Sequence, residues 1–172
     1  MSRLVGSPRD GGLRRFAALA VATAAGVGFA PIAPGTFGSL VGVGVFALIA
    51  PFGALAVALA IVLATGLGVW AAGEAEQIFA RKDDGRIAID EVVGQLVALW
   101  PLTLFAPDRA LAPLPLALGF LAFRAFDIVK PGPVRWAERH FPGGRGVVFD
   151  DLVAGGLAGL AVAGASLAGI AR

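Results

Sequence analysis

The chain has 172 residues, of which 58% are hydrophobic and only 15% are charged. About a quarter of the residues of a soluble domain are charged, so the composition favours an integral membrane protein over the alternative, a very apolar soluble helical globule. The absence of Cys excludes disulfides, zinc thiolate sites and cysteine nucleophiles, and the single His140 excludes His-rich metal sites. The net charge of +2 is typical of cytoplasmic Lys and Arg in a membrane protein, and it does not indicate nucleic-acid binding.

The N-terminal residues, MSRLVGSPRDGGLRR, are basic, and no charged side chain follows from Phe16 to Gly73. A signal peptide begins in the same way, but here the apolar character continues well past any cleavage point, so we expect the N-terminus to be retained. We predict a basic extension over residues 1–15 and one helical membrane domain over residues 16–172. No pattern in the sequence sets an oligomeric state.

The apolar runs are rich in Ala, Leu, Val and Gly and lack a period of two, which favours helices over a membrane barrel. Pro and Gly clusters separate the runs. The predicted fold is an all-α, multi-helix integral membrane bundle in a single domain, and its first two helices are short for full spans. The predicted helices cover residues 16–30, 38–50, 53–80, 88–106, 110–130 and 147–170.

Three clusters of Lys and Arg lie before residue 16, between residues 81 and 86, and between residues 130 and 145. The positive-inside tendency makes these clusters cytoplasmic. The segment 16–30 then lies in the interface or re-enters, 38–50 and 53–73 form a hairpin, and 88–106, 110–126 and 152–170 cross in turn. This multi-pass topology brings four polar segments to one depth near the cytoplasmic face: Pro34 to Thr36, Asp90 to Glu91, Arg124 to Lys130, and Asp150 to Asp151.

The first of these segments is APGTFGSLVG, residues 33–42. Gly35 permits a close approach of the backbone, and Thr36 or Ser39 is expected to cap the following helix. A helix N-terminus attracts anions, so the segment is a candidate phosphate contact. A plain turn with an N-cap explains it equally well.

Two pairs of adjacent carboxylates, Asp90–Glu91 and Asp150–Asp151, each open a long apolar stretch. Acidic side chains in a first helical turn complement the helix dipole, which is the simpler explanation for either pair alone. Charged side chains near the bilayer cost free energy, however, and commonly mark functional sites.

The segment FRAFDIVKPGP places Arg124 and Asp127 one helical turn apart, and Lys130 follows one turn later. An intrahelical ion pair with a snorkelling Lys is the alternative to a functional role. Arg binds phosphate oxygens as a fork, and Lys offers a point charge.

Taken together, five carboxylates and two cations at the ends of apolar elements are hard to leave unpaired. Oxygen ligands alone suit Mg²⁺, which carboxylates, water and substrate phosphate bind together. A water activated by such a metal is a suitable nucleophile for a phosphomonoester. The residues therefore predict a Mg²⁺-dependent reaction on a phosphorylated substrate at the cytoplasmic face.

Four motifs in this order resemble the phosphatidylglycerophosphatase A family: PGTFGSL (34–40), IDEVVGQ (89–95), FRAFDIVKPGP (123–133) and GVVFDDLVAG (146–155). The resemblance implies a bacterial inner-membrane enzyme that uses Mg²⁺ to hydrolyse phosphatidylglycerophosphate to phosphatidylglycerol and phosphate. It implies a catalytic and metal-binding set and a phosphate-binding set. The first comprises Asp90, Glu91, Asp127, Asp150 and Asp151, and the second comprises Arg124 and Lys130, with Gly35 and Thr36 nearby.

The chain departs from the family pattern at two places beside these motifs. Asp83–Asp84 stands where the family often has Asp-Pro, and Gly132 stands where it often has an aromatic residue. Both positions bear on substrate fit more than on chemistry. The CDP-alcohol phosphotransferases are rejected because their downstream Asp pattern is missing. The remaining alternative is an ion-coupled membrane transporter that uses the same carboxylates.

Overall fold

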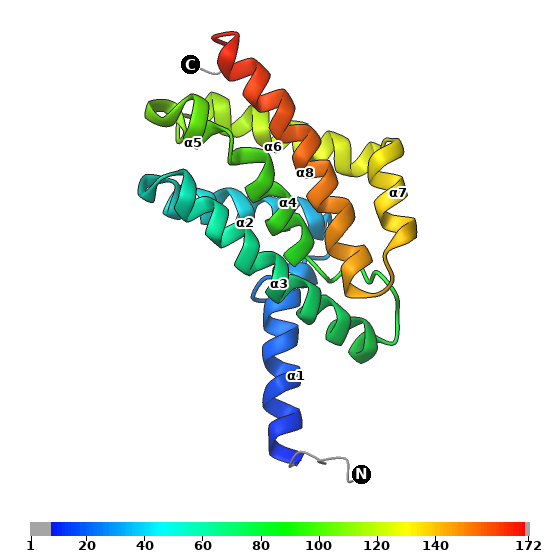
Figure 1. Cartoon of the computed structure of the whole chain (residues 1–172). Coiled ribbons are helices and arrows are strands. Elements are labelled where there is room, and N and C mark those ends of the chain that lie inside the picture. The colour runs from blue at the N-terminus through cyan, green and yellow to red at the C-terminus, as the bar shows by residue number, and fades with distance from the viewer. Residues whose placement is uncertain (1–7, 171–172) are drawn as a thin grey trace.

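A computed structural model describes residues 8–170, and over this range the chain is helical without strands, so the all-α prediction is confirmed (Figure 1). The helices are α1 (Pro8–Ala22), η1 (Val27–Phe29), α2 (Pro34–Ile49), η2 (Ala50–Phe52), α3 (Ala54–Phe79), α4 (Ile89–Leu99), α5 (Leu102–Phe105), η3 (Pro107–Arg109), α6 (Pro113–Val129), α7 (Gly132–His140) and α8 (Gly144–Leu167). Residues 1–7 of the predicted N-terminal extension lie outside the described residues, and the predicted boundary after residue 15 falls inside α1.

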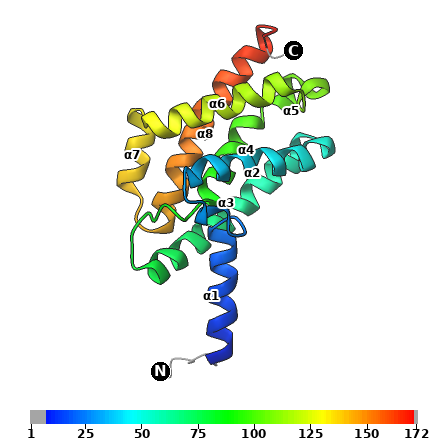
Figure 2. The same cartoon turned by 180° about the vertical axis from the view of Figure 1, so that it is seen from behind.

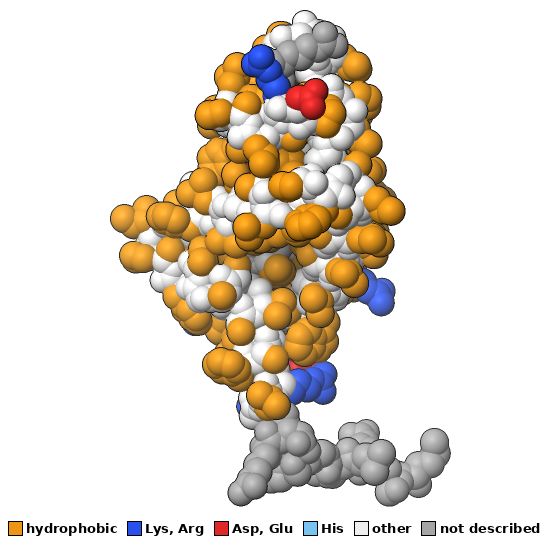
Figure 3. Space-filling model, turned by 90° about the vertical axis from the view of Figure 1, so that its left-hand side faces the viewer, with side chains coloured by type: hydrophobic (Ala, Val, Ile, Leu, Met, Phe, Trp, Pro, Cys, Tyr) orange, Lys and Arg blue, Asp and Glu red, His pale blue; other side chains and the backbone are white. Residues whose placement is uncertain are grey.

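Three segments of the described chain are long and apolar enough to cross a membrane: Pro34–Phe52, Ala54–Phe79 and Gly144–Leu167. Their outer surfaces carry large exposed apolar side chains such as Leu48, Phe52 and Leu55, each about three-quarters exposed. Apolar side chains are spread over the face seen in Figure 3, and charged side chains appear on it at only a few places. Soluble monomers rarely expose so large an apolar area, so these surfaces are suited to contact with lipid.

Helix α4 is the centre of the molecule. It packs against α2, α3, α6 and α8, and the side chains of Val93, Leu96 and Leu99 are almost completely buried (Figures 1 and 2). Its 11 residues span only about 16 Å, too short for a crossing of the bilayer. The predicted continuous helix over residues 88–106 is therefore wrong. Pro101 has no N–H to continue the helical hydrogen bonds, and the chain turns there before α5.

Two glycines bring the backbones of α4 and α8 into contact. A Cβ atom on Gly155 would lie 2.3 Å from the carbonyl oxygen of Gly94. A Cβ atom on Gly94 would lie 2.7 Å from the carbonyl oxygen of Asp151 and 2.5 Å from the ring of Phe123. Small residues allow such close helix packing in membrane proteins. This contact fixes the distance between the start of α4 and the acidic turn of α8.

Helices α1, α2 and α7 also differ from the prediction. Helix α1 begins before residue 16 and ends at Ala22, and the segment 23–33 that follows is a loop with a single 3₁₀ turn. Helix α2 begins at Pro34, earlier than residue 38, because proline is pre-organised for the first turn of a helix. Helix α7 was not predicted; it starts beside Pro133, and Val134 and Ala137 bury one of its faces.

Because of the contact between α4 and α8, we expect substitution by alanine to destabilise the protein at Gly155 but not at the neighbouring Gly156. Gly155→Ala should lower the unfolding temperature in mild detergent by about 5 °C, since overpacking of this kind costs about 1–3 kcal/mol. Gly156→Ala is the matched control, because open space surrounds Gly156 and the added methyl meets nothing within 4 Å. Equal unfolding temperatures for the two variants would contradict the close contact.

Candidate active site

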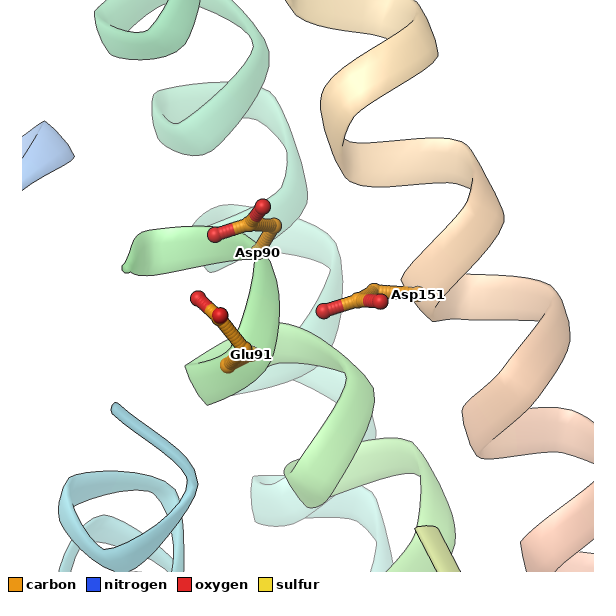
Figure 4. Close-up of side chains that lie close together, drawn as sticks. All are labelled: Asp90, Glu91 and Asp151. Atoms are coloured by element: carbon orange, nitrogen blue, oxygen red, sulfur yellow. The ribbon is translucent and has the colours of Figure 1, made fainter. Parts of the chain in front are cut away.

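Three carboxylates meet where the start of α4 faces α8. Asp90 and Glu91 lie in the first turn of α4, and Asp151 reaches them from α8 (Figure 4). One oxygen atom from each carboxylate lies within 4.8 Å of the other two. Asp90 and Asp151 are buried, with 8% and 3% of their surfaces exposed, and Glu91 is half-buried.

Asp90, Glu91 and Asp151 form the carboxylate cluster. Each of the three carboxylates has a buried oxygen atom without a hydrogen-bond partner among the described residues. These atoms are Asp90 Oδ1, Glu91 Oε2 and Asp151 Oδ2. Buried like charges repel one another strongly unless a cation lies among them. Three carboxylate oxygens in one small space are ligands that suit Mg²⁺, so the donor set fits the predicted metal.

The C-terminal half of α6 supplies an ion pair beside the cluster. Arg124 Nη1 lies 2.7 Å from Asp127 Oδ2, and only 15% of each side chain is exposed. Asp127 is close enough to Glu91 and Asp151 for their charges to interact. The Nε atom of Arg124 is buried and has no hydrogen-bond partner among residues 8–170. A buried guanidinium N–H without a partner beside this cluster is suited to bind a phosphate oxygen.

The first turn of α2 closes the site on another side. A Cβ atom on Gly35 would lie 2.2 Å from Glu91 Oε1 and 3.3 Å from Arg124 Nη1, so any larger residue would displace these two side chains. Ala33 precedes the helix in the left-handed conformation, with φ 49° and ψ 51°. Gly35 therefore lies at the site, as the sequence predicted for a close approach of the backbone.

The capping roles predicted for Thr36 and Ser39 are wrong, because α2 begins at Pro34 and both residues lie inside the helix. The hydroxyl of Ser39 donates a hydrogen bond to the carbonyl oxygen of Gly35 at 2.9 Å and accepts one from Arg124 Nη1 at 3.4 Å. Thr36 is half-buried in the first turn, where its backbone N–H donates to the carbonyl oxygen of Ala33.

Lys130, at the C-terminal end of α6, and Asp150, next to Asp151 on α8, form a second polar group. Lys130 Nζ donates to Asp150 Oδ2 at 2.8 Å and to Glu138 Oε1 at 3.0 Å. Burial alone lowers the pKa of Lys130, but the hydrogen bonds and charges of the two carboxylates outweigh it and raise that pKa. Lys130 is therefore charged at neutral pH and already held by Asp150 and Glu138.

The structure thus divides the five carboxylates that were predicted as metal ligands. Asp90, Glu91 and Asp151 form one group, while Asp127 pairs with Arg124 and Asp150 pairs with Lys130. Their catalytic and metal-binding roles stay predictions.

Three polar residues at or near the site were not predicted as site residues: Ser39, which was predicted only as a cap, Glu138 and Gln95. Gln95 is fully buried one helical turn after Glu91, and both of its amide atoms lack partners among the described residues. A lone amide in the apolar stretch from Val92 to Trp100 was the signal that could have singled it out.

The comparisons with known proteins bear on the identity of this site. Residues 20–166 match the model of the family described as phosphatidylglycerophosphatase A. The chain belongs to this family. The matched region contains all four motifs on which the resemblance was based, so that prediction is confirmed.

Curated relatives agree with this membership. The chain is 34% identical over 130 residues to phosphatidylglycerophosphatase A of Escherichia coli, covering 76% of this chain and 72% of the relative. It is 32% identical over 131 residues to the Haemophilus influenzae protein of the same name, covering 75% and 76%. It is 39% identical over 146 residues to a protein of Bacteroides thetaiotaomicron named putative phosphatidylinositol-3-phosphatase, covering 81% and 87%. No solved structure matches. The chain is therefore a phosphatase, and the transporter alternative is disfavoured.

The crowding of negative charge predicts that one carboxylate of the cluster lowers stability when no metal is present. With a chelator at neutral pH, Asp151→Asn should raise the unfolding temperature by about 3 °C, or about 1 kcal/mol, because the amide removes a buried charge. The control is Asp108→Asn, which changes an exposed carboxylate in η3 and should leave the unfolding temperature unaltered. A lower unfolding temperature for Asp151→Asn would contradict the proposed repulsion.

Proposed function

We propose that this phosphatase uses Mg²⁺ to hydrolyse phosphatidylglycerophosphate to phosphatidylglycerol and phosphate. The observation that carries the proposal is the carboxylate cluster, where three carboxylates each present a buried oxygen beside the buried Nε of Arg124, and none of these four atoms has a hydrogen-bond partner among residues 8–170. Such a site has ligands for a divalent cation and a donor for a phosphate oxygen side by side.

Asp90, Glu91 and Asp151 would hold the Mg²⁺ ion. When bound, Mg²⁺ offsets the negative charge of the phosphoryl group and lowers the pKa of a water molecule. Arg124 binds a phosphate oxygen, and Asp127 keeps the guanidinium of Arg124 in place through their ion pair. In the reaction, the oxygen of water forms a bond to phosphorus while its proton passes to a carboxylate of the site. The bond between phosphorus and the lipid glycerol oxygen breaks, and the carboxylate gives the proton to that oxygen, which leaves as a hydroxyl group.

A lipid substrate accounts for the position of the site. The acidic and basic groups lie in the first turn of α4, in the N-terminal third of α8 and in the last two turns of α6, while most of the remainder of these helices is apolar. The acyl chains can stay in the bilayer while the phosphate enters from the interface. Lys82, near Asp150, belongs to the basic segments that favour the cytoplasmic face of a bacterial inner membrane.

A second substrate is favoured by one specific observation. The Bacteroides thetaiotaomicron relative named putative phosphatidylinositol-3-phosphatase is 39% identical to this chain. Both substrates carry a phosphomonoester on a lipid head group, so the same metal and arginine chemistry serves either one. Discrimination between them depends on the head group alone.

Phosphate release by the purified full chain in mild detergent tests the proposal. With Mg²⁺ we expect release from phosphatidylglycerophosphate at a rate at least about tenfold above that from phosphatidylinositol 3-phosphate, and a chelator should abolish both. A faster reaction of phosphatidylinositol 3-phosphate would assign the second substrate. Undiminished release in the chelator would contradict the metal, and no release from either lipid by folded protein would contradict the proposed function.

Asp127→Asn should reduce turnover by about 100-fold or more, because the amide neither holds the charge of Arg124 nor accepts a proton. The fold should persist, since the substitution preserves the size of the side chain. Phosphate release and the unfolding temperature are measured together, with Asp108→Asn as the control. Substantial activity of Asp127→Asn would count against the proposed site.

A further inference from the structure

An apolar groove lies beside the first turn of α2, and no residue of the proposed mechanism lines it. Its volume is about 510 Å³, within the range of about 300–1,000 Å³ found for ligand pockets. The lining residues are Gly26, Val27, the segment 29–32 and Phe37. None of them carries a charge, so the groove is suited to hydrocarbon and offers no partner for a phosphate.

One wall of the groove, the loop between α1 and α2, is fixed to the segment that leads into the carboxylate cluster. The backbone N–H of Ala88 donates to the carbonyl oxygen of Ala22 at 2.8 Å. Gly28 is packed so tightly on Arg86 that a Cβ atom there would lie 1.9 Å from the Arg86 carbonyl oxygen. Figure 2 shows this loop beside the lower end of α4.

The other wall is α2, which separates the groove from the site by its own thickness. Gly35 and Gly38 face α4, where added Cβ atoms would lie 2.2 Å from Glu91 Oε1 and 3.2 Å from Glu91 Cβ. Phe37, between these two glycines, points outward into the groove and is 47% exposed. The groove and the carboxylate cluster therefore lie on opposite sides of the first turn of α2.

The loop holds an unusual backbone conformation that shapes the groove. Ala24, Ala25 and Ala33 all have positive φ values, of 47°, 58° and 49°. Such conformations are strained for residues with a Cβ and persist only where surrounding structure enforces them. Thr23 contributes to that enforcement, because its hydroxyl accepts a hydrogen bond from the N–H of Gly26 at 3.0 Å.

The groove is also continuous with the surface suited to contact lipid. Phe29 and Ile32 at its edge are 57% and 77% exposed, and Leu40 continues the exposed apolar surface along α2. This helix begins the candidate membrane-spanning segment Pro34–Phe52. The groove thus meets the surface expected to face the bilayer, and α2 alone separates it from the site.

We infer that this groove binds the first part of an acyl chain of the lipid substrate and so aligns the head group with the carboxylate cluster. The inference rests on the proposed function, since the site must act on a membrane lipid. An acyl chain fits the groove because it is uncharged and enters from the bilayer. When an acyl chain is bound in the groove, only the width of α2 separates it from Glu91 and Arg124, so the head group can reach both side chains.

The test compares phosphate release from two phosphatidylglycerophosphates, one with hexanoyl and one with palmitoyl chains, in mixed detergent micelles. For Phe37→Ala, the ratio of kcat/KM for the long-chain over the short-chain substrate should fall about tenfold, as expected for loss of part of an aromatic contact with hydrocarbon. Ala30→Phe, which fills the groove from its opposite wall, should lower the ratio similarly and provides a second, independent variant.

Phe52→Ala is the matched control, because Phe52 is an equally apolar and 78% exposed side chain at the far end of the same candidate span. It should retain the wild-type ratio. Wild-type ratios in both groove variants would overturn the inference, as would a change of oligomeric state in Phe37→Ala, since a second copy would then occupy the groove. Absence of release by the wild-type chain from either substrate would instead contradict the proposed function.

Discussion

The backbone contact between α4 and α8 at Gly94 and Gly155 is the constraint on which the rest of the molecule depends. Because no side chain separates the two helices there, Asp151 is brought up to Asp90 and Glu91. The same contact buries Asp90 and Asp151, and burial makes the repulsion between the charges costly. A wider spacing would relieve that repulsion, but it would also remove the ligand geometry of the site.

Such an arrangement is poor for stability and suited to function. Natural proteins retain strained or repelling groups where binding or catalysis needs them, and a bound cation or substrate offsets the cost. The apolar surroundings of the site affect both the phosphate and the acyl chains of a lipid substrate. They lower the local dielectric around the charges of the site, and they keep the entrance of the groove in contact with hydrocarbon.

Much of the site could be predicted because charges are scarce in this sequence. The side chains that stand out against apolar helices are those of Asp90, Glu91, Arg124, Asp127 and Asp151, and the predicted topology brought them to one depth. The pairing of Lys130 with Asp150 and Glu138 could not be predicted, because Glu138 lies on α7, a short helix hidden in a charged connection. Gln95 was missed because its burial depends on packing between distant helices, as does the shape of the loop before α2.

The central claim is that the carboxylate cluster of Asp90, Glu91 and Asp151 binds a divalent cation. Isothermal titration calorimetry of Mg²⁺ into the chelator-treated full chain in mild detergent tests it most directly. The account predicts saturable binding by the wild-type chain and by Asp108→Asn, with at least a tenfold weaker affinity for Glu91→Gln, which removes one charged ligand. Equal affinities of Glu91→Gln and the wild type, or no saturable binding by either, would contradict the account.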